Sequence, residues 1–288
     1  MKYTRRYRWA PARICDTKSG AHNSGQIIVL NYHLLSDYAG GANGPFCVSS
    51  AAFVKQLKVI KEKEIPVVCL AALINGTFAG DFGVILTFDD GNVSDFHIAF
   101  PALQERNLTA TFFPVVNNIG TSGYVAWQQL REIGRHDDFT IGSHGLSHRS
   151  LITLSKHEQQ HELECSKALI EQRIGRGVSY FAAPYGLYSK AIVELTREVG
   201  YKALMTTTPK VNVSVRRPFV VHRWNIRRRT SLEAFKRMLE GNGSISPVIS
   251  LAFACKRYVK ALLGWPVRLA ARGPGRAELE RRVDGART

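Results

Sequence analysis

Short apolar runs alternate with longer amphipathic stretches along most of this 288-residue chain. The uncharged runs are typical of strands buried on both faces, and the amphipathic stretches repeat their apolar positions at helical spacing. The predicted strands are 26–32, 67–69, 84–88, 110–115, 139–142, 178–182, 202–206 and 219–222. The predicted helices are 50–63, 94–106, 127–134, 155–174, 190–199 and 230–241. Repeated strand–helix units predict an α/β fold with a parallel sheet or a (β/α) barrel.

Two of the predicted helices begin with a capping signal. Ser155 is followed three residues later by Glu158, and Thr230 is followed by Glu233, which is the spacing of a capping box. Pro101 marks a start or a kink in the second predicted helix.

The chain divides into three predicted segments. Residues 26–243 hold the alternating elements and are predicted to form one barrel domain, because α/β barrels of about 250 residues fold as single units. Residues 1–25 form a basic N-terminal extension. Residues 244–288 form a basic C-terminal extension whose apolar positions predict an amphipathic helix over 246–263. The tail at 272–288 is rich in glycine and arginine and is predicted to be disordered. With 45% hydrophobic residues, the chain has enough apolar side chains for a real core.

The formal net charge of +16 favours an anionic partner, such as an acidic glycan, a nucleic acid or an anionic membrane face. No RNA- or DNA-binding motif occurs in the sequence, so we expect no specific nucleic-acid partner. A basic amphipathic helix such as 246–263 can lie peripherally on an anionic membrane, or it can pack its apolar face on the barrel. The sequence leaves both open.

The sequence favours a cytoplasmic location. The basic residues near the N-terminus are not followed by the apolar core of a signal peptide. The five cysteines are scattered and odd in number, which is typical of a reducing compartment. The basic C-terminal extension adds the hypothesis of a peripheral position at the inner face of the cell membrane.

Two adjacent carboxylates and a pair of imidazoles are the most informative residues for chemistry. Asp89 and Asp90 follow a buried run, and His144 and His148 follow the strand predicted at 139–142. One carboxylate and two imidazoles make a site for a divalent metal with open positions for water and substrate. The other carboxylate is then free to act as a base, so this set predicts a metal-dependent hydrolase.

Other polar residues also follow predicted strands. His33 comes after the first strand, and Pro184 and Tyr185 come after the strand at 178–182. In (β/α) barrels the catalytic groups lie at the carboxyl ends of the strands. Together with the aspartates and the histidine pair, four separate positions obey this rule, which supports the barrel.

Three motifs at these strand ends resemble those of a known family, the polysaccharide deacetylases or NodB-homology enzymes. They are TFDDG at 87–91, SHGLSH at 143–148 and FAAPYG at 181–186, in the order and spacing of that family. The resemblance covers about residues 26–229. It implies a distorted (β/α) barrel that uses a divalent metal, usually zinc and otherwise cobalt or nickel. It also implies that the enzyme removes acetyl groups from N-acetylated sugars.

The resemblance assigns roles residue by residue. The implied metal ligands are Asp90, His144 and His148. Asp89 would be the general base that takes a proton from the attacking water. The backbone N–H of Tyr185 would help to hold the oxyanion, with Pro184 beside it at the substrate.

Two departures from the family pattern point to substitute residues. The C-terminal Leu-x-His motif that supplies the general acid in most members is missing. Tyr32-His33 resembles a motif of a permuted branch that deacetylates poly-N-acetylglucosamine-type glycans, so His33 is the predicted acid. His222 is the alternative acid and a predicted substrate contact. Ala182 stands where many members carry an arginine that orients the base, and Arg223 is the predicted substitute.

A second zinc motif competes with this assignment. The segment HEQQH at 157–161 matches the HExxH motif of the zincin metalloproteases and lies on a predicted helix. Its polar neighbours, including Glu162 and Glu164, predict a solvated helix face, whereas zincins need a buried one.

We therefore predict a metal-dependent carbohydrate N-deacetylase whose substrate is an N-acetylated polysaccharide or lipid-linked glycan. Two alternatives stay open. The first is a catalytically impaired deacetylase fold that binds a glycan or a partner. The second, more remote, is a zinc metalloprotease.

Overall fold

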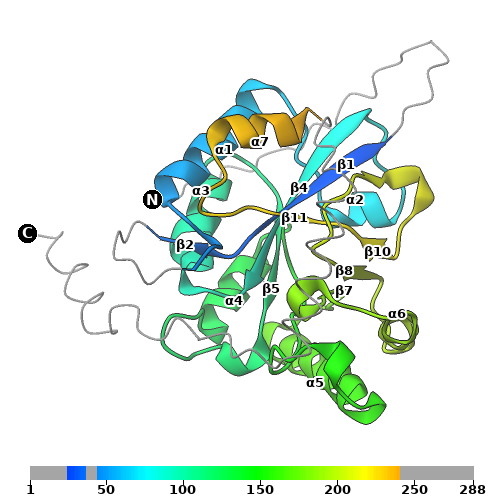
Figure 1. Ribbon diagram of the computed structural model, residues 1–288. Helices are drawn as coiled ribbons and strands as arrows, with labels where there is room; N and C mark the ends of the chain where they lie inside the picture. The colour runs from blue at the N-terminus through cyan, green and yellow to red at the C-terminus, as the bar shows by residue number, and fades with distance from the viewer. Residues whose placement is uncertain (1–24, 37–43, 241–288) are drawn as a thin grey trace, which may run out of the picture.

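The computed structural model describes residues 25–36 and 44–240 (Figure 1). The strands are β1 Gln26–Tyr32, β2 Leu34–Leu35, β3 Cys47–Val48, β4 Phe82–Asp90, β5 Ala110–Pro114, β6 Phe139–Ile141, β7 Tyr180–Ala182, β8 Ala203–Met205, β9 Asn212–Val213, β10 Val220–Val221 and β11 Trp224–Asn225. The α-helices are α1 Ser50–Glu62, α2 Leu70–Ile74, α3 Phe100–Gln104, α4 Trp127–Arg135, α5 Lys156–Ile174, α6 Lys190–Glu198 and α7 Leu232–Leu239. Short 3₁₀ and π turns are η1 Asp95–Ala99, η2 Val116–Asn118, η3 Leu151–Thr153, η4 Pro184–Gly186 and η5 Ser214–Arg216.

The strands form an incomplete ring made of two parallel sheets. Parallel strands follow one another in the order β11-β1-β4-β5-β6, and a second parallel sheet has the order β10-β8-β7. A single bridge between Ser143 and Phe181 links the end of β6 to β7. On the other side the chain runs from β10 through His222 and Arg223 directly into β11. Helices α1, α3, α4, α5 and α6 lie around the outside of the strands, so the fold is the distorted α/β barrel that the sequence predicts (Figure 1).

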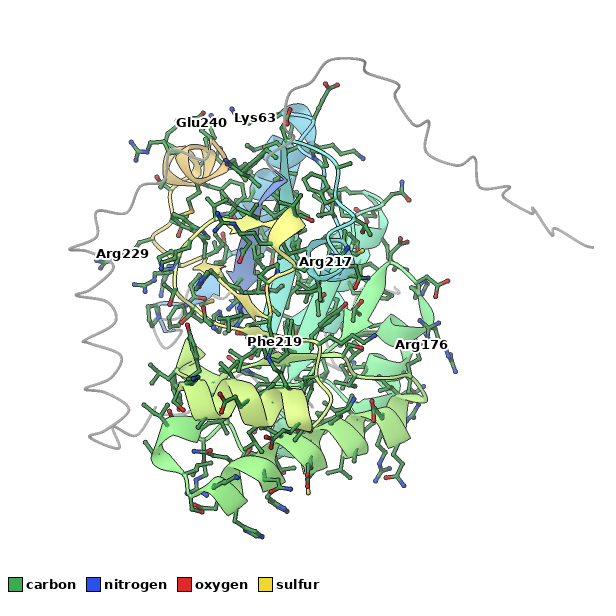
Figure 2. The ribbon with its side chains drawn as sticks, turned by 90° about the vertical axis from the view of Figure 1, so that its right-hand side faces the viewer. Lys63, Arg176, Arg217, Phe219, Arg229 and Glu240 are labelled. Atoms are coloured by element: carbon green, nitrogen blue, oxygen red, sulfur yellow. The ribbon has the colours of Figure 1, made fainter. Side chains whose placement is uncertain are left out.

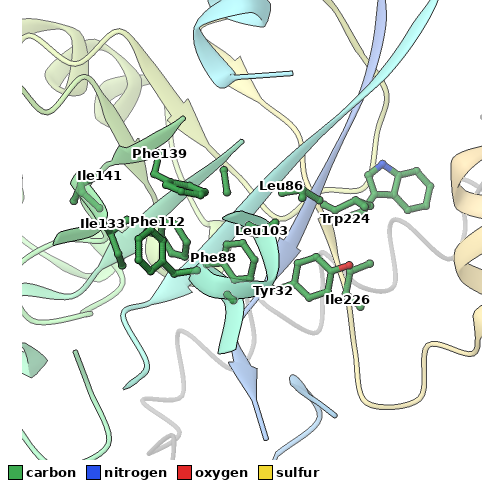
Figure 3. Packing of buried hydrophobic residues seen from close by; sticks show 14 of the residues in the cluster. Tyr32, Leu86, Phe88, Leu103, Phe112, Ile133, Phe139, Ile141, Trp224 and Ile226 are labelled. Carbon is green, nitrogen blue, oxygen red and sulfur yellow. The ribbon is translucent and has the colours of Figure 1, made fainter. Parts of the chain in front are cut away.

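Stacked aromatic rings fill the layer between the strands and the outer helices (Figure 3). Tyr32 of β1 stacks on Phe88 of β4 at 5.4 Å, and Phe88 stacks on Phe112 of β5 at 4.9 Å. Tyr32 and Phe88 are paired in the register of β1 and β4, as are Asn31 and Thr87. Because side chains alternate between the two faces of a strand, the polar pair points to the opposite face, into the ring.

Side-chain contacts join neighbouring elements on the outside of this ring. Lys63, which ends α1, lies 3.4 Å from the carboxylate of Glu240, which ends α7. The guanidinium of Arg197 on α6 lies 3.8 Å from the ring centre of Phe219, directly before β10 (Figure 2 labels Lys63, Glu240 and Phe219). No helix within the described ranges is long and apolar enough to cross a membrane.

Several element predictions are confirmed. Ser155 and Glu158 form the predicted capping box: Ser155 Oγ accepts the N–H of Glu158, and the Glu158 carboxylate accepts the N–H of Ser155. The long helix α5 then runs to Ile174, as predicted, and ends at Gly175 in the left-handed conformation.

Three element predictions are wrong in part. In place of a strand at 67–69, Val67 makes one bridge to Val84, and Cys69 is the N-cap residue of the short helix α2. The helix predicted at 94–106 is divided into the π turn η1 and the helix α3, because Pro101 cannot donate to the turn before it. The last helix is capped by Ser231, whose hydroxyl accepts the N–H of Ala234, and Thr230 is outside it. The helix predicted at 246–263 lies outside the described residues.

Candidate metal centre

Asp90, His144 and His148 meet at the carboxyl ends of the strands. Asp90 ends β4, and both histidines belong to the segment that follows β6. The Asp90 Oδ1 atom lies 3.6 Å from His144 Nε2 and 3.5 Å from His148 Nε2. Among the residues that the structure describes, these three form the group of side chains able to hold a metal ion. The sequence predicted this set.

The distances within the group fit a small divalent cation. Zinc binds imidazole nitrogen and carboxylate oxygen at about 2.0–2.2 Å, so two ligands of a tetrahedral site lie about 3.4 Å apart. The two distances from Asp90 Oδ1 are close to this value. A direct hydrogen bond would bring the same atoms to about 2.9 Å. The donor atoms are therefore spaced for an ion between them.

The protonation of His144 also suits a metal ligand. Its Nδ1 atom lies 2.8 Å from the carbonyl oxygen of Ala182, which can only accept a hydrogen bond. Nδ1 must therefore carry the proton, and Nε2 directs its lone pair toward Asp90. Burial lowers the pKa of His144 to about 4, against the opposing influence of Asp89. The imidazole is thus neutral at neutral pH, as coordination requires.

The backbone at the site adopts conformations that non-glycine residues rarely occupy. Asp90 has φ +77°, His148 has φ +61° and Tyr185 has φ +61°. Left-handed conformation costs an L-residue about 1–2 kcal/mol. Gly91 follows with φ +72°, and a Cβ there would lie 2.8 Å from the side chain of Pro114. Strained residues cluster at functional sites, which supports a functional role for this loop set.

Asp89 points into the ring and is held by Arg223. Two bonds of 2.7 Å join the guanidinium of Arg223 to the two carboxylate oxygens of Asp89. Both side chains are buried, with 0% and 2% of the side chain exposed. Arg223 also donates from Nε to the carbonyl oxygen of Thr206 at 2.9 Å. Arg223 therefore occupies the place that the sequence predicted for it, beside the candidate base.

The charge state of Asp89 follows from this pairing. Burial is the largest single influence and would raise the pKa of Asp89, but the charge and hydrogen bonds of Arg223 together with His144 and His33 outweigh it. The pKa of Asp89 therefore lies well below its usual range, and the carboxylate is ionised at neutral pH. Its Oδ2 atom is 3.9 Å from His144 Nε2, which puts the carboxylate beside the metal group.

Asn31 and Thr87 complete the surroundings of Asp89, and neither is predicted from the sequence as a site residue. The Asn31 amide donates to Asp89 Oδ2 at 2.9 Å and to Asn225 Oδ1 at 3.0 Å. Its carbonyl oxygen accepts from Thr87 Oγ1 and from Arg223, each at 2.9 Å. All these atoms therefore have partners, which makes a buried polar network rigid. The available signal was a polar Asn31 inside an otherwise apolar buried strand.

His33 lies at the same end of the ring. Its ring stacks on Phe46 with 4.6 Å between the ring centres, and its charge contributes to the low pKa of Asp89. The Nδ1 atom is buried and has no hydrogen-bond partner within the described residues. Buried polar atoms normally have a partner, so an unsatisfied ring nitrogen beside the candidate base is consistent with a catalytic or water-binding role.

His222 makes a different set of contacts. Its Nδ1 atom lies 3.4 Å from Thr206 Oγ1, and its backbone is bound on both sides by the side chain of Asn212. Burial lowers its pKa, and the charge of Lys210 lowers it further. None of these partners belongs to the metal group, so between the two candidate acids the geometry favours His33.

Two tyrosines flank Asp90. The ring of Tyr185, in the PYG turn with Pro184, lies 4.9 Å from the ring of His148 and is 38% exposed. Tyr124, which the sequence analysis missed, forms an antiparallel bridge with Asn92, two residues after Asp90. Burial raises the pKa of both phenols, and the charge of Asp90 raises it further. Both hydroxyls therefore stay protonated and can donate hydrogen bonds at the rim of the site.

The HEQQH segment forms no comparable site. His157 and His161 are exposed on α5, and neither belongs to the metal-capable group among the described residues. Glu158 is engaged by Ser155 at the helix start and by Arg149 at 3.0 Å. One part of the sequence interpretation is wrong, because Glu162 is buried with 5% exposed and does not lie on the solvated face.

The comparisons with known proteins agree with this geometry. Residues 79–204 match the family described as polysaccharide deacetylase. YxkH of Bacillus subtilis, provisionally named a polysaccharide deacetylase, is 27% identical over 157 residues, which cover 54% of this chain and 56% of that protein. The chain therefore spans little more than half the length of that relative. A poly-beta-1,6-N-acetyl-D-glucosamine N-deacetylase of Staphylococcus epidermidis is 23% identical over 225 residues, 68% of this chain and 77% of that protein.

Solved structures show the same fold. The polysaccharide deacetylase BC0361 from Bacillus cereus superposes with a TM-score of 0.67 at 25% sequence identity, covering 74% of this chain and 69% of that chain. The observed fold is thus the NodB type of barrel that the sequence predicts.

Proposed function

We propose that this chain, in which residues 79–204 match the polysaccharide deacetylase family, is a metal-dependent hydrolase that removes N-acetyl groups from the amino sugars of a glycan. The observation that carries this proposal is the pairing of an open Asp90–His144–His148 group with the adjacent, ionised Asp89. The poly-N-acetylglucosamine deacetylase among the relatives supports an N-acetylglucosamine polymer as substrate. Zinc is the proposed metal, because the spacing of the ligands matches its bond lengths.

In this proposal, different residues of the chain bind the metal and transfer protons during amide hydrolysis. A divalent cation held by Asp90, His144 and His148 would supply Lewis acidity to water and to the acetamide carbonyl. Asp89 accepts a proton from the attacking water, with its carboxylate aimed by Arg223 and Asn31.

The later proton transfer falls to His33 in this proposal. Its Nδ1 atom has no hydrogen-bond partner among residues 25–36 and 44–240, so the ring could hold a proton and deliver it to the leaving amine nitrogen as the C–N bond breaks. The N–H of Tyr185 would donate to the developing oxyanion from the PYG turn. The exposed ring of Tyr185 offers a face to a pyranose ring, beside Pro184.

Acetate release from a panel of N-acetylated glycans tests the proposal. The panel holds β-1,6-linked poly-N-acetylglucosamine, chitooligosaccharides and peptidoglycan, each with chelator and with zinc or cobalt added back. We expect release that chelator abolishes and zinc restores, and that Asp89→Asn reduces by at least about 100-fold. Metal-binding protein that releases no acetate from any glycan would support the alternative of a glycan-binding, catalytically impaired fold. Release by Asp89→Asn at the wild-type rate would remove the base assignment.

We further propose a peripheral position at an anionic membrane face, supported by the basic residues of 244–288. These residues lie outside the described part of the chain. Deleting 244–288 is expected to abolish sedimentation with phosphatidylglycerol liposomes and to leave acetate release from a soluble oligosaccharide unchanged. Liposome binding that survives the deletion would contradict this location.

A further inference from the structure

Glu162 is a buried carboxylate that the hydrolytic residues do not account for. It lies on α5, and its side chain reaches the segment between the two metal-ligand histidines. Its Oε2 atom accepts the backbone N–H groups of Leu146 at 2.8 Å and of Ser147 at 3.0 Å. Its Oε1 atom accepts the hydroxyl of Ser147. A buried carboxylate with three donors from one short segment is a strong, charge-assisted anchor.

The opposite side of the same segment is held as well. The carbonyl oxygens of Gly145 and Leu146 accept the N–H groups of Val116 and Asn117 at 3.1 and 2.9 Å. Gly145 has φ +84°, and a Cβ there would lie 3.1 Å from Glu162 Oε2. The segment is thus clamped between the carboxylate of α5 and the turn η2. This leaves its two ends, at His144 and His148, little freedom.

We propose that Glu162 is a positioning residue for the metal centre. It fixes the backbone of 145–147 so that the Nε2 atoms of His144 and His148 both face one cation near Asp90. The proposal rests on the metal site of the proposed function. It concerns how tightly that site binds its ion, and not which glycan is the substrate.

Outer partners of metal ligands typically affect affinity by about 10–100-fold. We therefore expect Glu162→Ala to raise the dissociation constant for zinc by about 10–100-fold. Glu162→Gln should stay within about 10-fold of wild type, because an amide oxygen can accept both N–H groups and the amide nitrogen can donate to Ser147 Oγ. The measurement is competition for zinc against a chromophoric chelator at neutral pH.

Glu171 provides the matched control on the same helix. Its carboxylate accepts the backbone N–H of Val178 at 2.8 Å and the ammonium of Lys167 at 2.6 Å, far from the histidine pair in the chain. Glu171→Ala should lower the free energy of unfolding of the zinc-free protein and leave zinc affinity unchanged. Equal losses of zinc affinity in Glu162→Ala and Glu171→Ala would show a general effect of stability and overturn the proposal.

Zinc titration of the Glu162 variants and of the wild-type protein separates the positioning role from the proposed function. Zinc binding by Glu162→Ala at wild-type affinity overturns the positioning role. If Glu162→Ala does not fold, Glu162→Asp replaces it, since the shorter carboxylate cannot reach both N–H groups, and wild-type affinity there overturns the proposal in the same way. A wild-type protein that binds no zinc removes both this inference and the proposed function. Tight zinc binding without acetate release removes only the function.

Discussion

Two histidine pairs with the same spacing lie in very different surroundings in this protein. His144 and His148 flank a clamped loop at the strand ends, and His157 and His161 lie one turn apart on the exposed face of α5. The first pair has a carboxylate within 3.6 Å of both Nε2 atoms, and one of its rings is oriented by a backbone carbonyl. For the second pair, the intervening Glu158 is engaged in capping its own helix. Spacing alone therefore does not make a metal site, because the partners around the imidazoles decide it.

Replacing one histidine from each pair gives the largest expected difference. His144→Ala should lose more than about 100-fold in zinc affinity, beyond the range typical of outer partners, and acetate release should fall with it. His161→Ala should match wild type in both measurements. Zinc titration of the two variants checks this, and a comparable loss in His161→Ala would return the zincin motif to consideration.

The ion pairs of the two regions should differ almost as much. Arg223→Met leaves Asp89 buried without its partner and should lower the free energy of unfolding by about 3–5 kcal/mol. Arg149→Met breaks the exposed pair with Glu158, and we expect little change, since exposed pairs are screened by water. Urea denaturation compares the two variants. Arg223→Lys should recover only part of the loss, because an ammonium cannot make both bonds to the carboxylate. Full recovery would contradict the need for two bonds.

Burial of His144 predicts a pH dependence of the zinc-free protein. The folded pKa of about 4 lies below the unfolded value of 6.5. Between these values the unfolded chain binds a proton at this site that the folded protein does not. The free energy of unfolding should therefore fall as the pH drops from about 6.5 to about 4, by up to about 3 kcal/mol.

Urea unfolding of chelator-treated protein at several pH values measures this slope. His144→Gln has no group that titrates in this range and should show a shallower slope, whereas His157→Gln should keep the wild-type slope. Identical slopes in all three proteins would refute the assignment to His144.

The smallest expected effect concerns the start of α5. Ser155→Ala removes the hydroxyl that accepts the N–H of Glu158, and loss of such a cap costs about 1 kcal/mol. Zinc affinity should stay at the wild-type value, because this end of the helix is separate from the anchor at Glu162. Thermal unfolding and zinc titration of one preparation check both points. Weakened zinc binding would indicate that the two regions are coupled through α5.

The strand ends were the most predictable part of the site. An apolar run predicts where a buried strand stops, so the positions of Asp89, Asp90 and His144 at the edge of the ring follow from the sequence pattern. The role of Arg223 follows from the missing arginine at Ala182. Ala182 ends β7, and Arg223 follows β10, which is two strands from β7 in the same sheet.

Other features of the site depend on tertiary contacts, which the spacing of apolar residues along the chain does not predict. Glu162 lies among polar neighbours in the sequence, yet its position four residues before Ser166 and eight before Ile170 lies on the buried face of α5. The single bridge between Ser143 and Phe181, which joins the two sheets, leaves no sequence signature either. Thr230 was the predicted cap of the last helix, but the neighbouring Ser231 caps it. A capping motif therefore does not fix the first residue of a helix when two adjacent residues carry a hydroxyl.

The left-handed backbone of Asp90 and His148 has a consequence for how this protein can change over generations. Glycine would adopt this conformation at both positions without steric strain. The aspartate and the histidine therefore lower the stability of the folded protein, and they are present because their side chains can bind a metal. A descendant no longer selected for the proposed hydrolysis would gain stability by losing these two side chains first. Retention of both residues in a divergent lineage would therefore be a sign of continued selection for the bound ion.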